Sequence, residues 1–215
     1  MEEFEREPVA EPMEQETMSA EKKEKTLTKA QQIFKDAKDI LYILAAFMLV
    51  YVLFFRAVVV VGDSMFDTFA DGDRLLLVSN VLYQNPKPGD IVVASKDSFR
   101  NGECIIKRVI ATEGQTVDID FATGTVYVDG VALDEPYLYS GTYRQEGVKF
   151  PLTVDEGCVF VMGDNRMDSK DSRSPEIGLI DEREILGKVI FLMIPGTGSS
   201  DQPIDFDLSR IGVVE

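Results

Sequence analysis

The stretch Val59-Val60-Val61-Gly62-Asp63-Ser64-Met65 closes a long apolar run and sets a serine directly beyond it. Gly-Asp-Ser is ordinary turn chemistry, because glycine allows unusual backbone angles and the side chains of aspartate and serine hydrogen-bond nearby backbone groups. Ser64 is therefore either a turn residue or a nucleophile held at a membrane surface. The segments on either side of the stretch bear on which of the two it is.

An uncharged apolar run lies upstream, from Ile40 to Phe55, and Arg56 follows it. The run is slightly short of the roughly 20 apolar residues that span a bilayer, but an arginine can extend its charge to the interface. We therefore predict a transmembrane anchor over residues 40–61, with a buried core helix as the alternative. A cleaved signal peptide fits less well, because no small-x-small site closes the run and a long segment precedes it.

The segment before the run changes from acidic to basic. Residues 1–20 are rich in glutamate and cannot bury a core, which predicts a disordered acidic tail. Residues 21–39 carry the lysines and predict a basic lead-in helix: Lys22, Lys23, Lys25, Lys29, Lys35 and Lys38. By the positive-inside rule, these lysines place the N-terminus in the cytoplasm and the residues after the anchor outside it.

Beyond Gly62 the pattern is that of short strands, because apolar β-branched segments alternate with Gly, Pro and Asp turn signals. We expect strands over residues 74–78, 90–94, 105–110, 158–162 and 185–194, and a hairpin formed by residues 116–119 and 125–128. These strands predict an all-β outer domain over residues 62–196, followed by a loop-like C-terminal tail over residues 197–215.

The composition excludes several kinds of site. Because the chain has no histidine, it has no Ser-His-Asp triad, no Cys-His dyad and no histidine-ligated metal. A formal net charge of −16 provides no basic field for phosphates, so we expect no nucleic-acid partner. We also expect no metal or cofactor. Cys104 and Cys158 lie in apolar segments and are expected to be buried free thiols, with a disulfide between their strands left open.

Lys107 lies in the middle of the apolar segment Ile105-Ile106-Lys107-Arg108-Val109-Ile110. Strand alternation puts Lys107 and Arg108 on opposite faces beside apolar neighbours, so one of the two is a candidate for the interior. An edge strand with a gatekeeping charge is the alternative. Burial lowers the pKa of a lysine, and a neutral amine can take the proton of a serine hydroxyl. In a chain without histidine, Lys107 is the best available partner for Ser64.

A polar segment, residues 163–173, follows the apolar strand at 158–162. The simplest interpretation is a polar surface loop. The segment also holds serine, aspartate and arginine at close spacing, which suits side chains that orient a catalytic amine.

Together these blocks resemble the type I signal peptidases in order and spacing. The resemblance rests on Gly62-Asp63-Ser64-Met65, Gly72-Asp73-Arg74, Ile106-Lys107-Arg108-Val109-Ile110, Gly163-Asp164-Asn165-Arg166 and Ser169-Lys170-Asp171-Ser172-Arg173, and also takes in Asp134-Glu135-Pro136-Tyr137 and Gly178-Leu179-Ile180. It covers residues 40–195. The layout with a single predicted membrane span resembles that of the Gram-positive branch of the family. It implies a mainly β fold: one transmembrane helix, then a β-rich catalytic core with an inserted β-rich segment over residues 114–157.

The resemblance also implies a role for each candidate residue. Ser64 would be the nucleophile, with its backbone N–H as one oxyanion donor, and Lys107 would be the general base. Ser169 would hydrogen-bond the lysine amine, in front of an ion pair between Asp171 and Arg173. The shallow pockets for small substrate side chains would be lined by Met65, Ile105 and Ile106.

Some positions depart from the family pattern. The usual Pro-Thr-Leu is Asp67-Thr68-Phe69 here, the usual Gly-x-Pro-Gly-Asp is Ala111-Thr112-Glu113-Gly114-Gln115, and Gly62 stands where some relatives carry an oxyanion-binding hydroxyl. The expected function is a membrane-anchored serine endopeptidase that removes N-terminal signal peptides from exported preproteins, so its partners are signal peptides and the lipid bilayer. The alternatives are a non-catalytic or narrowly specialised anchored binding or assembly protein on the same fold, and a self-cleaving Ser-Lys regulator.

Overall fold

The structure is a computed structural model that describes residues 29–96, 99 and 102–214. The predicted acidic tail, residues 1–20, and the start of the basic lead-in, residues 21–28, lie outside the described residues. The chain divides into two compact units, residues 1–49 and residues 50–215, and each is described by itself.

Helix α2 (Lys29–Phe54) contains the rest of the lead-in and most of the apolar run. Its segment Gln31–Phe54 has a mean hydropathy of 2.0, and among the described helices it is the one long and apolar enough to cross a membrane. The helix ends at Phe54, and strand β1 (Phe55–Val59) begins at once. The boundary predicted at residue 61 is therefore too late, because the β-branched valines after Arg56 pair in a sheet.

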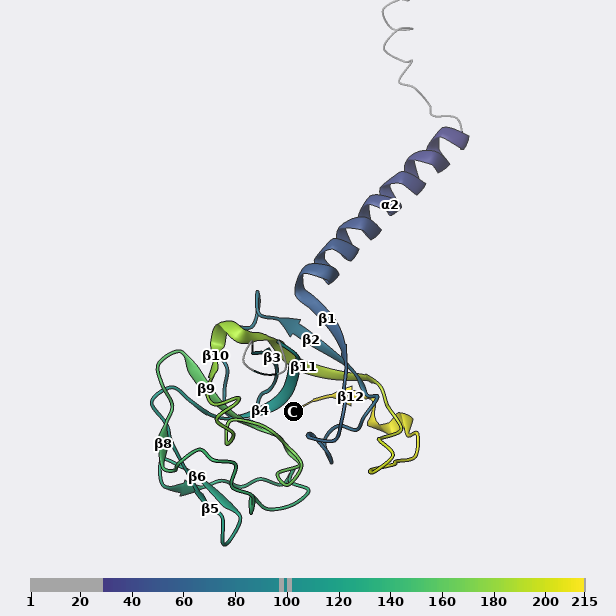
Figure 1. Ribbon diagram of the computed structural model, residues 1–215. Helices are drawn as coiled ribbons and strands as arrows, with labels where there is room; N and C mark the ends of the chain where they lie inside the picture. The colour runs from purple at the N-terminus through teal and green to yellow at the C-terminus, as the bar shows by residue number, and fades with distance from the viewer. Residues whose placement is uncertain (1–28, 97–98, 100–101, 215) are drawn as a thin grey trace, which may run out of the picture. The chain divides into compact units, whose positions relative to one another are not determined.

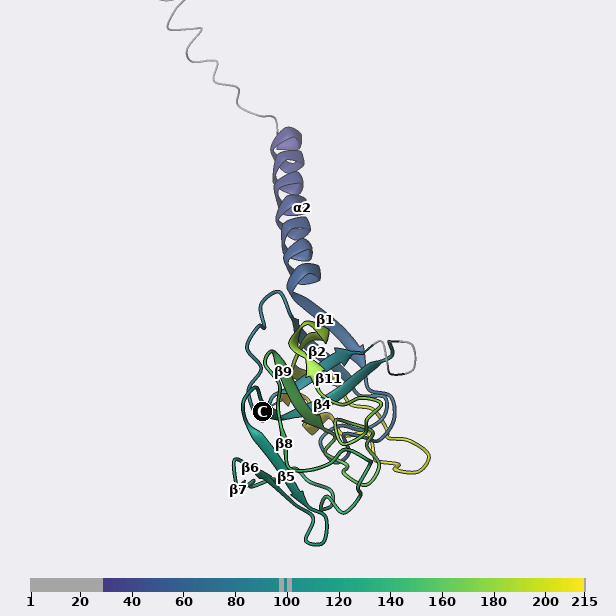
Figure 2. The ribbon, with the colours of Figure 1, turned by 60° about the vertical axis from the view of Figure 1, so that its left-hand side comes forward.

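Within the described residues, eight strands form the main sheet (Figures 1 and 2). Seven of them follow the order β1-β2-β11-β3-β4-β9-β10, with antiparallel neighbours, and β12 pairs with β11. Their bounds after β1 are β2 (Arg74–Ser79), β3 (Ile91–Ser95), β4 (Cys104–Thr112), β9 (Cys158–Met162), β10 (Ile180–Asp181), β11 (Ile185–Ile194) and β12 (Gly212–Val213).

A second sheet is inserted between β4 and β9, where the sequence predicts an inserted β-rich segment. Its order is β7-β6-β5-β8, made of β5 (Thr116–Asp120), β6 (Thr125–Val128), β7 (Val131–Ala132) and β8 (Leu152–Thr153). The predicted hairpin is β5 and β6. The turn from β6 to β7 uses Asp129 and Gly130, both with positive φ, a conformation that aspartate and glycine adopt readily.

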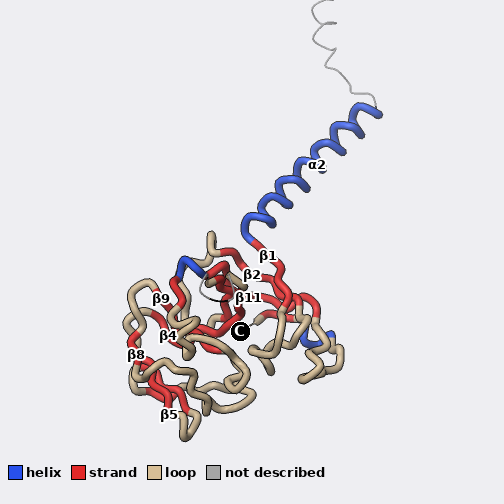
Figure 3. The backbone as a smooth tube through the Cα atoms, in the orientation of Figure 1, coloured by secondary structure: helices blue, strands red, loops and turns tan. Residues whose placement is uncertain are grey.

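Buried apolar side chains form three clusters around the two sheets, whose strands are red in Figure 3. The alternation of side chains along a strand explains how these clusters form. In β2, Leu75 and Leu77 face the core and are buried, while Arg74 is exposed. Strand β4 lies between β3 and β9 and is covered on both faces. The mainly β architecture predicted from the sequence is confirmed.

Two smaller expectations need correction. Cys104 and Cys158 are both free, but Cys104 is exposed and Cys158 is half-buried, because they stand at the first positions of β4 and β9 rather than within them. The C-terminal tail is also more ordered than a loop. It contains the 3-10 helix η2 (Leu208–Arg210) and strand β12, which pairs with β11.

Candidate active site

Ser64 lies in the connection between β1 and β2, where the chain leaves the sheet and folds back. Backbone hydrogen bonds close this connection: the Val60 N–H donates to Asp73 O (2.8 Å) and the Gly72 N–H to Val60 O (3.0 Å). Gly62 has a φ of +83°, a conformation that costs a side-chain-bearing residue free energy. Its N–H donates to Asp71 Oδ1 (2.7 Å). This backbone conformation explains a glycine at this position.

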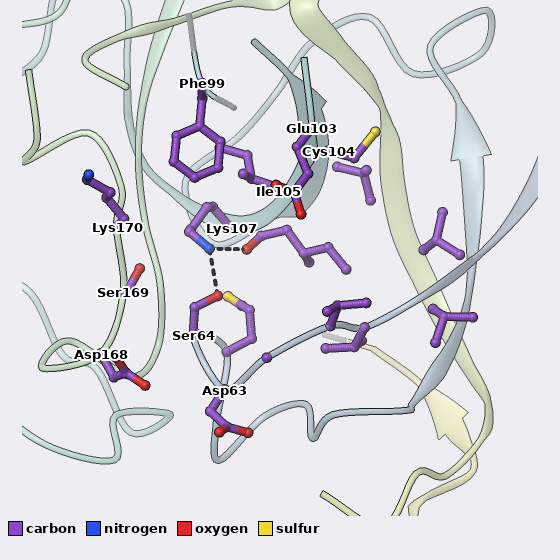
Figure 4. A pocket seen from close by; sticks show the side chains of 18 of the residues that line it. Asp63, Ser64, Phe99, Glu103, Cys104, Ile105, Lys107, Asp168, Ser169 and Lys170 are labelled. Atoms are coloured by element: carbon purple, nitrogen blue, oxygen red, sulfur yellow. Dashed lines mark hydrogen bonds between the residues drawn. The ribbon is translucent and has the colours of Figure 1, made fainter. Parts of the chain in front are cut away.

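Strand β4 brings Lys107 to the serine. The Lys107 amine donates to Ser64 Oγ (2.7 Å) and to the Ile106 carbonyl (2.8 Å), as the dashed lines in Figure 4 mark. The lysine is only 4% exposed. Burial lowers the pKa of Lys107 from 10.5 to about 8, with a smaller lowering from Arg173, while Asp171 and Asp164 act in the opposite direction.

Arg108, the next residue, is buried as well. Its guanidinium pairs with Asp164 through two hydrogen bonds (2.9 and 2.8 Å) and lies 3.9 Å from the centre of the Tyr137 ring. The sequence pattern predicted that one of the two charges could be interior, whereas the structure buries both. The alternative of an edge strand is wrong, because β4 is paired on both sides.

The polar segment after β9 is held by a buried ion pair between Asp171 and Arg173, whose side chains are both 0% exposed. Two parallel hydrogen bonds of 2.8 Å join them. Burial by itself would raise the pKa of Asp171. The bonds from Arg173, from the Gly163 N–H and from the Ser169 hydroxyl nevertheless hold the pKa of that carboxyl below its usual value.

The structure differs from expectation at Ser169. Its hydroxyl donates to Asp171 Oδ2 (2.8 Å), while the Lys107 amine bonds to Ser64 and Ile106 within the described part of the chain. Ser169 is buried and lines the same cavity as Lys107. The direct bond from Ser169 to the amine is therefore absent, because the nearby carboxylate is the stronger acceptor for the hydroxyl.

The same segment also fixes the backbone of the turn that carries Ser64. The Asn165 N–H donates to Ser64 O (3.1 Å), and the Asn165 side chain donates to Asp63 O (3.1 Å). A Cβ on Gly163 would lie 2.4 Å from Ser64 O and 2.2 Å from Ser169 Oγ, so only glycine fits at this approach. We assigned no role to Asn165 or Gly163 from the sequence, although a glycine directly after a buried strand is a signal for close backbone approach.

A cavity of about 560 Å³ surrounds Ser64 and Lys107. All three predicted pocket residues line it: Met65, Ile105 and Ile106. Side chains without a predicted role also line it, among them Phe99, Arg144, Glu146 and Asp168. Arg144 and Glu146 come from a polar loop of the inserted segment, where the sequence has no periodicity to indicate them. Among the described residues, no group of three or more Cys, Asp or Glu side chains is placed to hold a metal ion.

Comparison with known proteins gives consistent results. The family model for signal peptidase, peptidase S26, matches residues 33–194. The signal peptidase I of Bacillus licheniformis is 36% identical over 180 residues, covering 80% of this chain and 94% of the relative. Signal peptidase I T of Bacillus subtilis (strain 168) is 34% identical over 181 residues, covering 80% and 91%. A crystal structure of a signal peptidase I from Enterococcus faecalis V583 is 32% identical and covers 48% of this chain and 96% of that one, with a TM-score of 0.41.

Proposed function

This chain belongs to the signal peptidase family of peptidase S26, and from that membership we propose that it removes signal peptides from preproteins through a dyad of Ser64 and Lys107. One observation carries the assignment of the dyad: a buried lysine amine lies 2.7 Å from a serine hydroxyl. A serine peptidase needs a base for its nucleophile, and the chain contains no histidine that could serve.

In the proposed reaction, Ser64 Oγ attacks the scissile carbonyl while the neutral amine of Lys107 accepts the hydroxyl proton. Collapse of the tetrahedral intermediate passes this proton to the leaving amine and forms an acyl-enzyme, which water then hydrolyses. The Ser64 N–H has no hydrogen-bond acceptor within the described residues, so it is available to the oxyanion.

The residues behind the dyad affect the pKa of the Lys107 amine in opposite directions. A lone Asp171 carboxylate would favour the charged amine and raise the pKa of Lys107. Arg173 is paired to that carboxylate at 2.8 Å and opposes this effect, so burial dominates. We infer that Asp171 and Arg173 support the base electrostatically, and that Ser169 positions Asp171.

The cavity supports a proposal for the substrate. It is lined by Val58 and Val59 of β1, by Ile105 and Ile106 at the start of β4, and by Met65 from the connection after β1. We propose that the preprotein lies there as an extended strand and offers small residues one and three positions before the cut. A large aromatic residue directly before the cut would then be rejected, because overfilling a packed pocket is penalised sterically.

We further propose that α2 spans the membrane once, with residues 21–39 in the cytoplasm and the catalytic domain, about residues 62–196, outside it. The length and hydropathy of Gln31–Phe54 support a span. The lysines before the apolar run support the orientation.

The test is cleavage in trans. Detergent-solubilised wild type and Ser64→Ala are incubated with a preprotein that has alanine before the cut, and the new N-terminus is sequenced. We expect wild type alone to release the mature protein. A wild type that binds signal peptides but never cuts them would instead favour the anchored binding protein, and self-cleavage without cleavage in trans would favour the regulator.

A further inference from the structure

The C-terminal segment, residues 195–214, folds back onto the connection that carries the nucleophile, and it is yellow in Figure 1. Asp73 anchors it at two points: the Gly196 N–H donates to Asp73 Oδ1 (2.6 Å), and Arg210 forms two hydrogen bonds with the same carboxylate (3.0 and 2.6 Å). The Gly198 N–H donates to Asp71 O (3.2 Å). Asp71 in turn accepts from Gly62, two residues before Ser64.

One contact of this segment reaches the residue beside the nucleophile. The Ser199 hydroxyl donates to Asp63 Oδ2 (2.5 Å), and the Gln202 N–H donates to Ser199 Oγ (3.1 Å), which fixes the hydroxyl's direction. Asp63 lines the active-site cavity, yet its carboxylate points away from the Ser64 hydroxyl (Figure 4). Its other oxygen, Oδ1, is buried and has no hydrogen-bond partner in the described part of the chain.

This contact has an electrostatic consequence for the reaction. Negative charge develops on the substrate oxygen next to the Ser64 N–H, and a carboxylate that turned toward it would oppose the charge in a site of low dielectric. Among the described residues, the Asp63 carboxylate accepts one hydrogen bond, from the Ser199 hydroxyl. This bond therefore restrains the direction of the carboxylate.

We propose that Ser199 is a positioning residue for the transition state: it holds the Asp63 carboxylate away from the developing oxyanion. This inference rests on the proposed function, because it concerns the same nucleophile. Ser199 itself does not line the cavity that contains Ser64. It acts through Asp63, so its effect should fall on kcat rather than on KM.

The experiment is a double-mutant cycle on the full-length protein in detergent, with a peptide substrate that carries alanine before the cut. The variants are Ser199→Ala, Ser199→Thr, Asp63→Asn and the double variant. Ser200→Ala is the matched control, because Ser200 is the exposed neighbour and contacts Asp201 instead. Thermal melting checks that each variant is folded at the assay temperature.

We expect Ser199→Ala to lower kcat about tenfold, the size of one lost hydrogen bond to a charged group, with KM unchanged and Ser199→Thr active. In the Asp63→Asn background the same substitution should cost less than about twofold, because no charge is left to restrain. Ser200→Ala should match wild type. An equal loss in both backgrounds, a change in KM alone, or a fully active Ser199→Ala would overturn the inference while wild-type cleavage stands. A wild type that cuts nothing would overturn the proposed function together with the inference.

Discussion

At the scale of single residues, the central feature is a lysine that the fold holds where a charged amine is disfavoured. Lys107 is 4% exposed and has no carboxylate as a direct hydrogen-bond partner among the described residues; its amine contacts a hydroxyl and a carbonyl. Those two neutral acceptors replace part of its hydration without fixing its charge. The neighbouring Arg108 has the opposite arrangement, because a buried carboxylate accepts two of its hydrogen bonds. Two adjacent basic residues on one strand therefore have different partners: neutral acceptors for Lys107 and a carboxylate for Arg108.

The first prediction concerns pH. Only the neutral amine of Lys107 can accept the serine proton, and burial lowers its pKa to about 8. The neutral fraction grows as pH rises through that value, so kcat/KM should rise through about pH 8 and level off above it. Lys107→Arg keeps the positive charge but does not deprotonate in this range. It should therefore lose activity as completely as Lys107→Ala.

A half-buried lysine outside the cavity provides the control for this prediction. Lys188 of β11 pairs with Asp90 and does not line the cavity, so Lys188→Arg should keep the wild-type rate and pH profile. Because Arg108 lies on the opposite face of the strand, Arg108→Lys would also be expected to keep activity. It is a poorer control, because Arg108 forms a buried two-bond pair with Asp164 that lysine cannot reproduce. An active Lys107→Arg, or a pH profile without the rise, would contradict the assignment of the base.

At the scale of elements, the candidate site depends on the close approach of Gly163, directly after β9, to the turn that carries Ser64. Gly163→Ala would place a Cβ 2.4 Å from Ser64 O, and backbone at that distance has to move. We expect this variant to lose most activity, because the displaced turn takes Ser64 out of reach of Lys107. Gly212→Ala is the matched control, since it adds the same methyl group in open space. Equal cleavage rates for the two variants would contradict this account.

The ion pair behind the base supports a second prediction at this scale. Arg173→Met leaves the buried Asp171 carboxylate without its partner, which should destabilise the fold by about 3–5 kcal/mol. Arg183→Met removes an exposed pair with Asp181 and should change the melting temperature far less. In any folded Arg173→Met, Asp171 is no longer neutralised, so the pKa of Lys107 and the rise in activity should shift to higher pH. Melting curves and pH profiles of both variants measure these effects, and an unshifted profile would contradict the electrostatic role of Arg173.

The elements also show which features a sequence can predict. Strands β9 and β11 have the predicted bounds, because each is an uninterrupted β-rich run that ends at a glycine or proline signal. The pairing of Ser64 with Lys107 was predicted from the absence of histidine and from the family resemblance, since no local pattern joins residues 43 positions apart. The bonds from Ser169 to Asp171 and from Ser199 to Asp63 were missed. Which acceptor a hydroxyl chooses depends on the packing of distant segments, and polar loops have no periodicity that would reveal it.

At the scale of the whole molecule, charge and apolar surface are unevenly distributed along the chain. The chain has a net charge of −16, yet the residues just before the apolar part of α2 include Lys29, Lys35 and Lys38. An acidic domain is not attracted to anionic lipid by charge. In the proposed anchoring, the hydrophobic helix α2 rather than charge therefore holds the protein at a bilayer.

The last prediction concerns the orientation of the chain in a membrane. The lysines before the span, and the lack of any basic residue between Arg56 and Arg74, favour an N-terminus in the cytoplasm. Protease added to intact protoplasts that express the protein should therefore digest the region after Gly62, while an epitope at the N-terminus survives until the membrane is broken. Changing Lys29, Lys35 and Lys38 together to glutamate should reduce the digested fraction, because it removes the described part of the basic flank. The exposed lysine Lys87 lies outside this flank, and Lys87→Glu serves as a single charge-reversal control that should leave the pattern unchanged. A catalytic domain that resists protease until lysis would reverse the proposed orientation, and it would separate the site from preproteins that have already crossed the membrane.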